Sequence, residues 1–476
     1  METGACTFLG LLVNFSSTFS APSFDNFVIL TKAWVLCIGR RTIARVLRFG
    51  GLTDDQRERH SAFYRFLSRA KWDVDDLASC LLQLVLRAVP DDCPLVLVVD
   101  DTLCRKSGSH IWGCGMHHDP LLSNYGRGKT LVKFFSFGHS WVILCACVRL
   151  PWDNKRVIAI PVGFRLYRSK TRCPLDEYRK RTQLARELLN NILAWVPGRL
   201  VQLVADSEYA CKTLVRDLPQ QVVFVGPMHA DAAFFAPPKP EKNRGRPRKK
   251  GDRLLSPSQI IADRWHPWKS VVVVMYGREV EVLYKTQVGL WYTVSGARIV
   301  RMFVTRDPAG HIDDRAYFTT DPEMGIVGFA LLFSFRWSQE EMHHNVKHYL
   351  GLEDPHNGWW RRPAGKRHNK RIPGPQPHSK RGVLAIKHTV PFILSTYGIT
   401  VLWYLSNGSF QLDVERVRRR APWYRHKTYP SFSDMLAALR RHLWSERIIS
   451  EPYEIKGCVK KNSTLDPTIE DVLCAA

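Results

Sequence analysis

The sequence predicts a mixed α/β protein, and three segments carry this prediction. The apolar run from Leu95 to Val99 has the composition of a buried strand and leads directly into Asp100. A second apolar run, residues 200–205, leads into Asp206 in the same way. Farther along the chain, Glu340 lies in a stretch with helical periodicity. Strands that end on carboxylates, and a helix that carries another, indicate a sheet with an acidic site at its edge.

The first part of the chain, residues 1–92, is predicted to form a helical N-terminal domain. Patterned stretches at about 60–71 and 74–89 have the periodicity of helices that face a core. No clear helix-turn-helix signature is present in this region. We therefore predict a helical bundle and leave open whether it also contacts DNA.

Residues 93–227 are predicted to form the first part of a catalytic core. The first strand is expected to end at Asp100, and the fourth, at about 200–205, leads into Asp206. The element order β-β-β-α-β-α-β matches an RNase H-like sheet, in which the first and fourth strands are neighbours. The remaining expected elements are strands at 132–150, 156–167 and 221–225, a helix at 175–195 and a short helix from Tyr209.

The stretch between Asp206 and Glu340 is longer than such a core needs, and we interpret residues 228–320 as a β-rich insertion domain. It begins with a basic, Pro/Gly-rich loop at 239–253. Strand-like runs follow at 270–276, 280–284, 290–294 and 298–304. The core is expected to resume at 321–410, with a closing helix from about Asp321 and a basic segment, before a basic C-terminal extension at 411–476.

The composition favours a nucleic-acid partner. The chain has 69 Lys and Arg residues against 44 Asp and Glu residues, a formal net charge of +25 and a pI near 9.7. A basic excess of this size favours binding to a polyphosphate that weakens as salt is added. A soluble protein with a solvated basic face is the alternative interpretation.

Cysteine usage and hydropathy point to a cytoplasmic protein with no membrane partner. The twelve cysteines form no C-x-x-C pair, so neither a disulfide framework nor a zinc site is indicated. No Lys or Arg precedes Lys32, so the start of the chain lacks the positive region of a secretory signal. The uncharged stretch 389–412 is interpreted as a buried helix rather than a membrane span.

The three carboxylates are the ligands that a two-metal phosphoryl-transfer site requires. On one helical face, Arg336 precedes Glu340 by four residues and Lys347 follows it by seven. In this interpretation Glu340 ligates metal, Arg336 binds a phosphate or orients the carboxylate, and Lys347 neutralises a phosphate of DNA. The alternative is an amphipathic helix with ordinary ion pairs between successive turns.

At these residues the chain resembles the DDE transposases of bacterial insertion sequences, in the branch with the signature Y-x2-R-x3-E-x6-K and a β-rich insertion. Arg336, Glu340 and Lys347 match the spacing, and Phe333 stands where the family usually has tyrosine. The resemblance covers roughly residues 60–410. It implies that Asp100, Asp206 and Glu340 form the catalytic, metal-binding triad.

The resemblance also implies the activity and partners. The expected protein binds the terminal inverted repeats of an element, cleaves the DNA ends and joins the 3′-hydroxyl to target DNA. Its cofactors would be two Mg²⁺ ions, for which Mn²⁺ substitutes. It would work on double-stranded DNA as a homodimer in a synapse, with the C-terminal extension at 411–476 as the expected dimer interface. It would be found in the bacterial cytoplasm, associated with the nucleoid. An RNase H-like nuclease without strand transfer and a catalytically inactive, DNA-binding transposase relic are the alternatives.

Two of the triad assignments have a neighbouring competitor. Asp100 is preferred to Asp101 because it fits the family's Asp-x-Thr form with Thr102. Glu340 is preferred to Glu341 because only Glu340 keeps the spacing to the arginine and lysine of the signature.

Further DNA-binding candidates lie in two basic segments. Arg244 and Arg246 occur in an Arg-Gly-Arg-Pro sequence that resembles the core of an AT-hook, although a solvated loop is an equal alternative. Trp359, Arg361 and Arg362 begin a basic stretch that suits contact with the DNA backbone and stacking on a base.

Overall fold

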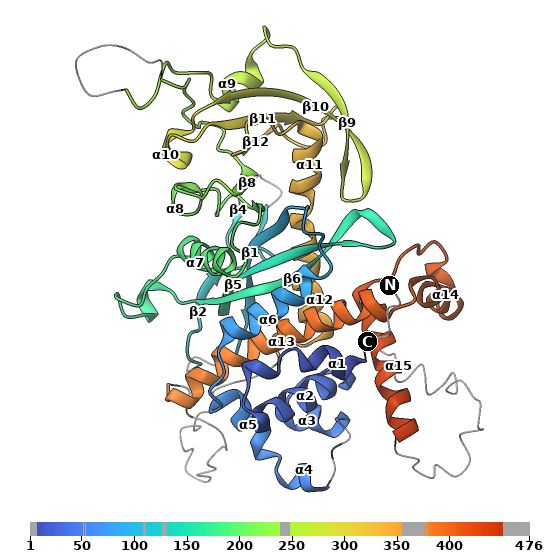
Figure 1. Cartoon of the computed structure of the whole chain (residues 1–476). Helices are drawn as coiled ribbons and strands as arrows, with labels where there is room; N and C mark the ends of the chain where they lie inside the picture. Colours follow the sequence, from blue (N-terminus) through green and yellow to red (C-terminus); the bar gives the residue numbers. More distant parts are fainter. Residues whose placement is uncertain are drawn as a thin grey trace.

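The fold is built on a single large sheet with helices on both faces, as the computed structural model shows (Figure 1). The structure describes residues 7–50, 52, 54–107, 111–125, 131–238, 248–354, 376 and 378–450. In the described residues the sheet has ten strands. Nine of them follow the order β2-β5-β1-β7-β8-β12-β11-β10-β9, and the tenth, β6, pairs with β5. The mixed α/β class and this sheet are consistent with the predicted RNase H-like core.

The strands of the central region are long and mostly buried. β1, β7 and β8 are parallel, whereas β5 pairs antiparallel with β1, β2 and β6. The strands are β1 (Leu95–Arg105), β2 (Gly115–His118), β5 (Phe135–Leu150), β6 (Asp153–Tyr167), β7 (Val201–Ala205) and β8 (Val222–Pro227), beside a separate two-stranded pair, β3 (Asn124–Tyr125) and β4 (Leu131–Val132).

The pairing of β1 with β7 places two carboxylates at one level of the sheet. Val99 is in register with Ala205, so Asp100 and Asp206 follow at the same edge. The predicted adjacency of these strands is therefore confirmed. The predicted end of the first strand is wrong, because β1 continues for five residues beyond Asp100. Its antiparallel partner β5 extends the ladder as far as the pair Arg105–Gly138.

Four further strands extend the same sheet beyond β8. β12 pairs antiparallel with β8, and β11, β10 and β9 follow in antiparallel order. The predicted strand at 290–294 is wrong, because Trp291 is buried beside Phe318 and the chain turns there into a short helix. The elements are α9 (Pro257–Ala262), β9 (Lys269–Met275), β10 (Arg278–Gly289), α10 (Tyr292–Ser295), β11 (Val300–Arg306) and β12 (Arg315–Thr319). The predicted division into domains stays a prediction.

The helix that carries Glu340 begins later than expected. Asp321 accepts a hydrogen bond from the amide of Glu323 and forms a turn, and the first helix, α11 (Ile326–Ser334), starts only after Gly325. A second helix, α12 (Arg336–Tyr349), follows after one residue, Phe335, whose φ of −65° and ψ of −20° stay helical. The two helices therefore run on with almost no change of direction, and α12 crosses the sheet beneath β1 and β6.

The remaining helices pack around the end of the sheet that carries β6 and below it (Figure 1). α7 (Arg181–Trp195) packs on β5 and β6, and α8 (Lys212–Val215) lies beside it. The N-terminal helices are α1 (Phe8–Val13), α2 (Ala21–Leu36), α3 (Ile43–Phe49), α4 (Asp54–Glu58), α5 (Ser61–Ser68) and α6 (Val74–Leu86). The C-terminal elements are α13 (Lys380–Asn407), α14 (Phe410–Arg420), the 3₁₀ turn η3 (Pro422–Tyr424) and α15 (Phe432–Ser450).

α13 is the central helix of this lower half. Its Gly398 lets the side chains of Leu81 and Ile160 approach at distances where a Cβ would be 3.0 Å from each. Among the described residues, α13 alone is long and apolar enough to cross a membrane, and 89% of its most apolar window is buried inside the protein. The prediction of a buried helix in this region is therefore confirmed.

Candidate active site

The three predicted acidic residues belong to three elements that meet at one edge of the sheet. Asp100 lies within β1, Asp206 directly follows β7, and Glu340 lies in the second turn of α12. The guanidinium of Arg336 joins two of them, with Nη1 2.6 Å from Glu340 Oε1 and 3.9 Å from Asp100 Oδ2. The side chains of Asp100, Arg336 and Glu340 are 17%, 24% and 33% exposed, so this group opens to solvent only on one side.

The carboxylates of this site carry more negative charge than their surroundings compensate. Burial, with the negative charges of Asp206 and Asp101, raises the pKa of Asp100 to about 8, against the smaller effects of the Asp101 amide and Arg336. Burial also raises the pKa of Asp206, although the amides of Tyr209 and Glu208 donate hydrogen bonds to it. Clustered acids with perturbed pKa values are typical of functional sites.

Asp101 points to the opposite face of the sheet from Asp100, as successive residues of a strand must. Both of its oxygens are engaged there. Oδ2 lies 3.1 Å from Arg181 Nε and accepts a hydrogen bond of 3.0 Å from Ser140, while Oδ1 accepts one of 3.2 Å from the Tyr209 hydroxyl. The choice of Asp100 as the catalytic acid stays a prediction, and the full set of partners around Asp101 supports it.

The predicted companions of Glu340 have distinct surroundings. The ammonium of Lys347 donates a 2.7 Å hydrogen bond to the carbonyl of Leu103, in the part of β1 beyond Asp100. The ring of Phe333 packs against Tyr317 of β12, with centroids 4.8 Å apart, so apolar packing accounts for the residue at this position. Burial raises the pKa of Glu341, which faces Arg156 and Trp337 rather than Arg336.

On the α7 face, Glu208 completes a second group of charges. Arg181, the first residue of α7, lies 3.5 Å from Glu208 as well as next to Asp101, and its guanidinium stacks over the ring of Tyr167 at 4.3 Å. Sequence reasoning missed Arg181, Ser140 and Tyr209. The one available signal was the position of Tyr209 three residues after Asp206, and no spacing rule marks the other two.

The motif His117-His118-Asp119 does not form a metal site in the described part of the chain. Asp119 accepts two hydrogen bonds from Arg105 and one from Ser136, and these hold the pKa of its carboxyl well below its usual range. Burial and the charge of Arg181 lower the pKa of His117 to about 4. These residues therefore have a structural role, in which Asp119 links the end of β2 to β1 and β5.

The remaining DNA-binding candidates lie outside the described residues. Arg244 and Arg246 belong to the stretch 239–247, and Trp359, Arg361 and Arg362 to the stretch 355–375. Their predicted roles stay predictions.

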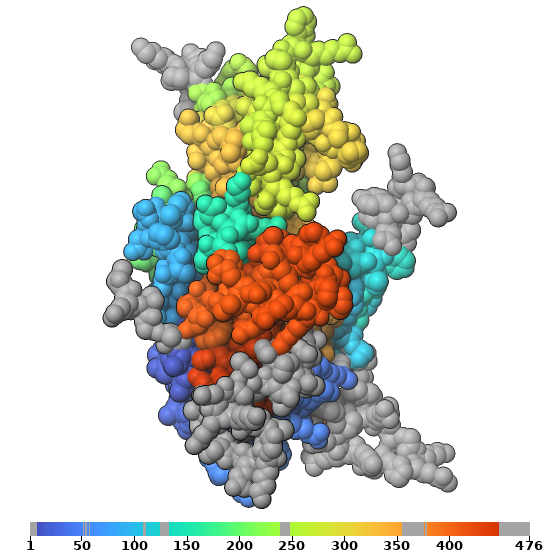
Figure 2. Space-filling model, turned by 90° about the vertical axis from the view of Figure 1, so that its right-hand side faces the viewer, coloured from blue at the N-terminus to red at the C-terminus, as the bar shows by residue number. Residues whose placement is uncertain are grey.

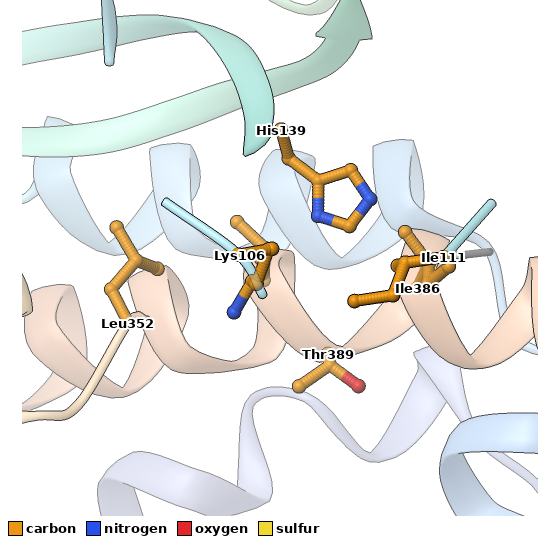
Figure 3. Close-up of a pocket in the computed structure, with 7 residues that line it drawn as sticks. Lys106, Ile111, His139, Leu352, Ile386 and Thr389 are labelled. Carbon is orange, nitrogen blue, oxygen red and sulfur yellow. The ribbon is translucent and has the colours of Figure 1, made fainter. Parts of the chain in front are cut away.

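A small pocket lies away from the acidic edge, between the far end of β1 and α13 (Figure 3). Lys106 and His139 enter it over Ile386 and Thr389 of α13. Lys106 is six residues beyond Asp100, about 20 Å along an extended chain. Its ammonium donates a hydrogen bond of 2.7 Å to the carbonyl of Glu353. The pocket is thus a gap in the packing that the buried lysine bridges, and it is separate from the candidate active site.

The oxygen donors at the acidic edge fit a hard divalent cation. Burial is the main cause of the raised pKa of Asp100, and the charge of Asp206 adds to it, so a bound cation would offset part of this effect. With Glu340 held by Arg336, the described residues contain no ready-made group of three or more ligands for one ion. The ion pair with Arg336 occupies Glu340, and the predicted metal-binding role of the three carboxylates stays a prediction.

The mixed sheet and the acidic edge are consistent with a metal-dependent nuclease, and comparison with known families supports this class. A family described as DDE superfamily endonuclease matches residues 14–282, more than half of the chain. The chain therefore belongs to this family, whose members generally use divalent metal ions such as Mg²⁺. The matched region contains Asp100 and Asp206 and ends within β10, so Glu340 lies beyond it. No curated protein matches the chain.

Proposed function

We propose that the protein is a DNA transposase that cleaves the ends of an insertion sequence and joins the freed 3′-hydroxyl to target DNA. The observation that carries the proposal is the meeting of Asp100, Asp206 and Glu340 at one edge of the sheet, around Arg336. Family membership supports nuclease chemistry, and the matching spacing of Arg336, Glu340 and Lys347 supports transposition.

The chemistry at this edge is displacement at phosphorus. In end cleavage a water oxygen attacks phosphorus, the bond from phosphorus to the 3′-oxygen breaks, and that oxygen takes up a proton to become the free 3′-hydroxyl. In joining, this 3′-hydroxyl loses its proton as it attacks a phosphodiester of the target, and the target strand's own 3′-oxygen leaves and is protonated. Asp100, Asp206 and Glu340 would hold two Mg²⁺ ions, which supply charge neutralisation to the phosphate and to the attacking and leaving oxygens when bound.

Arg336 has two roles in this proposal. Without metal, its guanidinium balances the charges of Glu340 and Asp100. When DNA and metal are present, the same guanidinium is placed to donate hydrogen bonds to a phosphate oxygen beside the carboxylates. The partners would be double-stranded DNA, as terminal repeats and target, and a second copy of the chain that holds the other DNA end.

The test is an end-cleavage and strand-transfer assay with Mg²⁺ on the terminal DNA of the element that encodes the protein. Glu340→Gln is expected to abolish both products. Glu341→Gln is the matched control, since it changes the adjacent residue on a different face of α12 and should leave both products. Cleavage without joined product would identify a nuclease. DNA binding without either product in the wild type would identify a relic.

A further inference from the structure

The segment after α13 forms a basic and aromatic surface that the proposed active site does not use. We define the α14–η3 surface by Arg418, Arg419, Arg420, Trp423, Tyr424 and Arg425, all of which are exposed. Residues 410–427 contain six Lys and Arg residues against two acidic ones. In Figure 2 this orange-red region forms the broad face below the β9–β10 hairpin.

The orientation of α14 is fixed by its one buried acid. Asp413 is 4% exposed and accepts hydrogen bonds from the Tyr404 hydroxyl at 2.9 Å, from Arg441 at 2.5 Å and from Arg416 at 3.2 Å. These contacts hold the inner face of α14 against α13 and α15. The arginines at the end of the helix consequently face solvent, and the charge of Asp413 is balanced by its partners within the protein.

Two aromatic rings stand beside these arginines. Trp423 is 76% exposed and Tyr424 56%, and their ring centroids are 6.3 Å apart. Adjacent aromatic rings this exposed mark a binding surface when charged residues frame them. A basic surface that follows a phosphate backbone, with rings on which bases stack, is the arrangement that binds single-stranded nucleic acid.

A second copy of the chain fits this surface poorly. In a two-fold symmetric interface centred here, the surface would meet its own copy, which contributes no carboxylate to pair with the arginines. A polyanion instead gains from each of these charges and releases counterions on binding.

We infer that the α14–η3 surface binds single-stranded DNA, with the arginines on the backbone and Trp423 stacked on a base. The choice of DNA over another polyanion rests on the proposed function. This surface would hold a strand that has separated from its complement near a cleaved end, while the acidic edge of the sheet acts on the phosphate.

The experiment measures binding of the full chain to a fluorescein-labelled dT20 oligonucleotide and to a 20-base-pair duplex, by anisotropy in EDTA so that no cleavage occurs. Trp423→Ala is expected to weaken dT20 binding about tenfold and duplex binding much less. Arg419→Ala should weaken both and reduce the slope of log affinity against log salt by about 0.7 for the single strand. Leu412→Ala, an exposed apolar residue of α14, and Arg179→Ala, an exposed arginine before α7, are the controls and should leave binding unchanged.

Several results would overturn the inference. The first is that the wild type does not bind dT20 at low salt. The second is that Trp423→Ala binds dT20 as tightly as the wild type does. The third is that Trp423→Ala loses affinity equally for dT20 and for the duplex. If Trp423→Ala changed the molar mass measured by light scattering and left dT20 binding unchanged, the surface would instead be one of self-association. Because the assay needs no catalysis, it can be repeated with Glu340→Gln. If instead the wild type bound dT20 through this surface and cleaved no DNA with Mg²⁺, this inference would stand and the proposed function would be rejected.

Discussion

The hydroxyl of Tyr209 donates a hydrogen bond to Asp101 Oδ1 over 3.2 Å. The backbone amide of the same residue donates to Asp206 Oδ1 at 3.4 Å. Tyr209 is fully buried, so it ties the loop after β7 to β1 at the level of the acidic edge. One residue outside the triad thereby adds a tie between β1 and the loop after β7, at the point where the pairing of β1 with β7 ends.

Tyr209→Phe tests this positioning. The variant keeps the ring and loses a hydrogen bond to a charged group, which should lower the free energy of unfolding by about 2 kcal/mol. The concentration of Mg²⁺ needed for half-maximal thermal stabilisation should also rise several-fold. Tyr404→Phe is the control, because it removes a comparable bond to Asp413 far from the site. Equal metal dependence in the two variants would show that Tyr209 contributes to stability alone.

Replacing each of the two adjacent aspartates should have opposite effects on stability. Asp100→Asn removes a carboxyl whose pKa in the folded state is raised to about 8. The ionisation of this group therefore no longer lowers the free energy of unfolding. A raised carboxyl pKa lowers stability as the pH rises from the unfolded value of about 4 towards 8. The gain in stability from Asp100→Asn without metal should therefore grow between pH 5 and pH 8.

Asp101→Asn is the matched comparison. It breaks the contacts with Arg181 and Tyr209 and should lower the free energy of unfolding at pH 7. Urea denaturation in EDTA measures both variants. If Asp101→Asn were the stabilised variant and lost catalysis while Asp100→Asn kept it, the assignment of the first acid would have to be reversed.

Arg336→Met should make the protein depend more strongly on metal. Without the guanidinium, the charges of Asp100 and Glu340 lack their cation, so the midpoint of thermal unfolding in EDTA should fall. Mg²⁺ should then raise the midpoint by more in the variant than in the wild type. Arg165→Met removes the arginine that pairs with Asp75 elsewhere in the fold. In this variant Mg²⁺ should raise the unfolding midpoint by as much as it does in the wild type. Identical increments in both variants would exclude a charge-balancing role for Arg336.

Acid should destabilise the fold through four buried histidines, namely His117, whose pKa is lowered to about 4, and three others. Burial lowers the pKa of His139 and His388 to about 4 and that of His343 to about 3. An unfolded histidine takes up its proton at about pH 6.5, so the unfolded state binds more protons between pH 6.5 and 4 and stability falls as the pH decreases through this window. The thermal midpoint should drop by several degrees between pH 7 and pH 5. His388→Gln should flatten this dependence, and an unchanged slope would assign it to other groups.

The sequence carried enough information for the core strands and for the order in which the acids occur. Apolar runs that end on Asp100 and Asp206 are local patterns, and strand pairing then brought them together as expected. The extension of β1 to Arg105 was missed because it depends on its partner β5, which is distant in sequence. The contacts of Asp101 with Ser140 and Arg181 were missed for the same reason, since they join residues about 40 and 80 positions apart that share no motif. The sequence also did not indicate that the helix is divided at Phe335. The division is slight, since the dihedral angles of this residue hardly differ from those of a helix.

The buried Arg440 of α15 donates a 2.8 Å hydrogen bond to the carbonyl of Val35 in α2, across 405 residues of sequence. α2 therefore cannot reach its final packing until α15, 405 residues later, has left the ribosome. At about 5–20 residues per second, this delay lasts roughly 20–80 s. During synthesis the apolar side of α2 lacks its partner α15, and the contact between these two helices forms only after the intervening elements have been made.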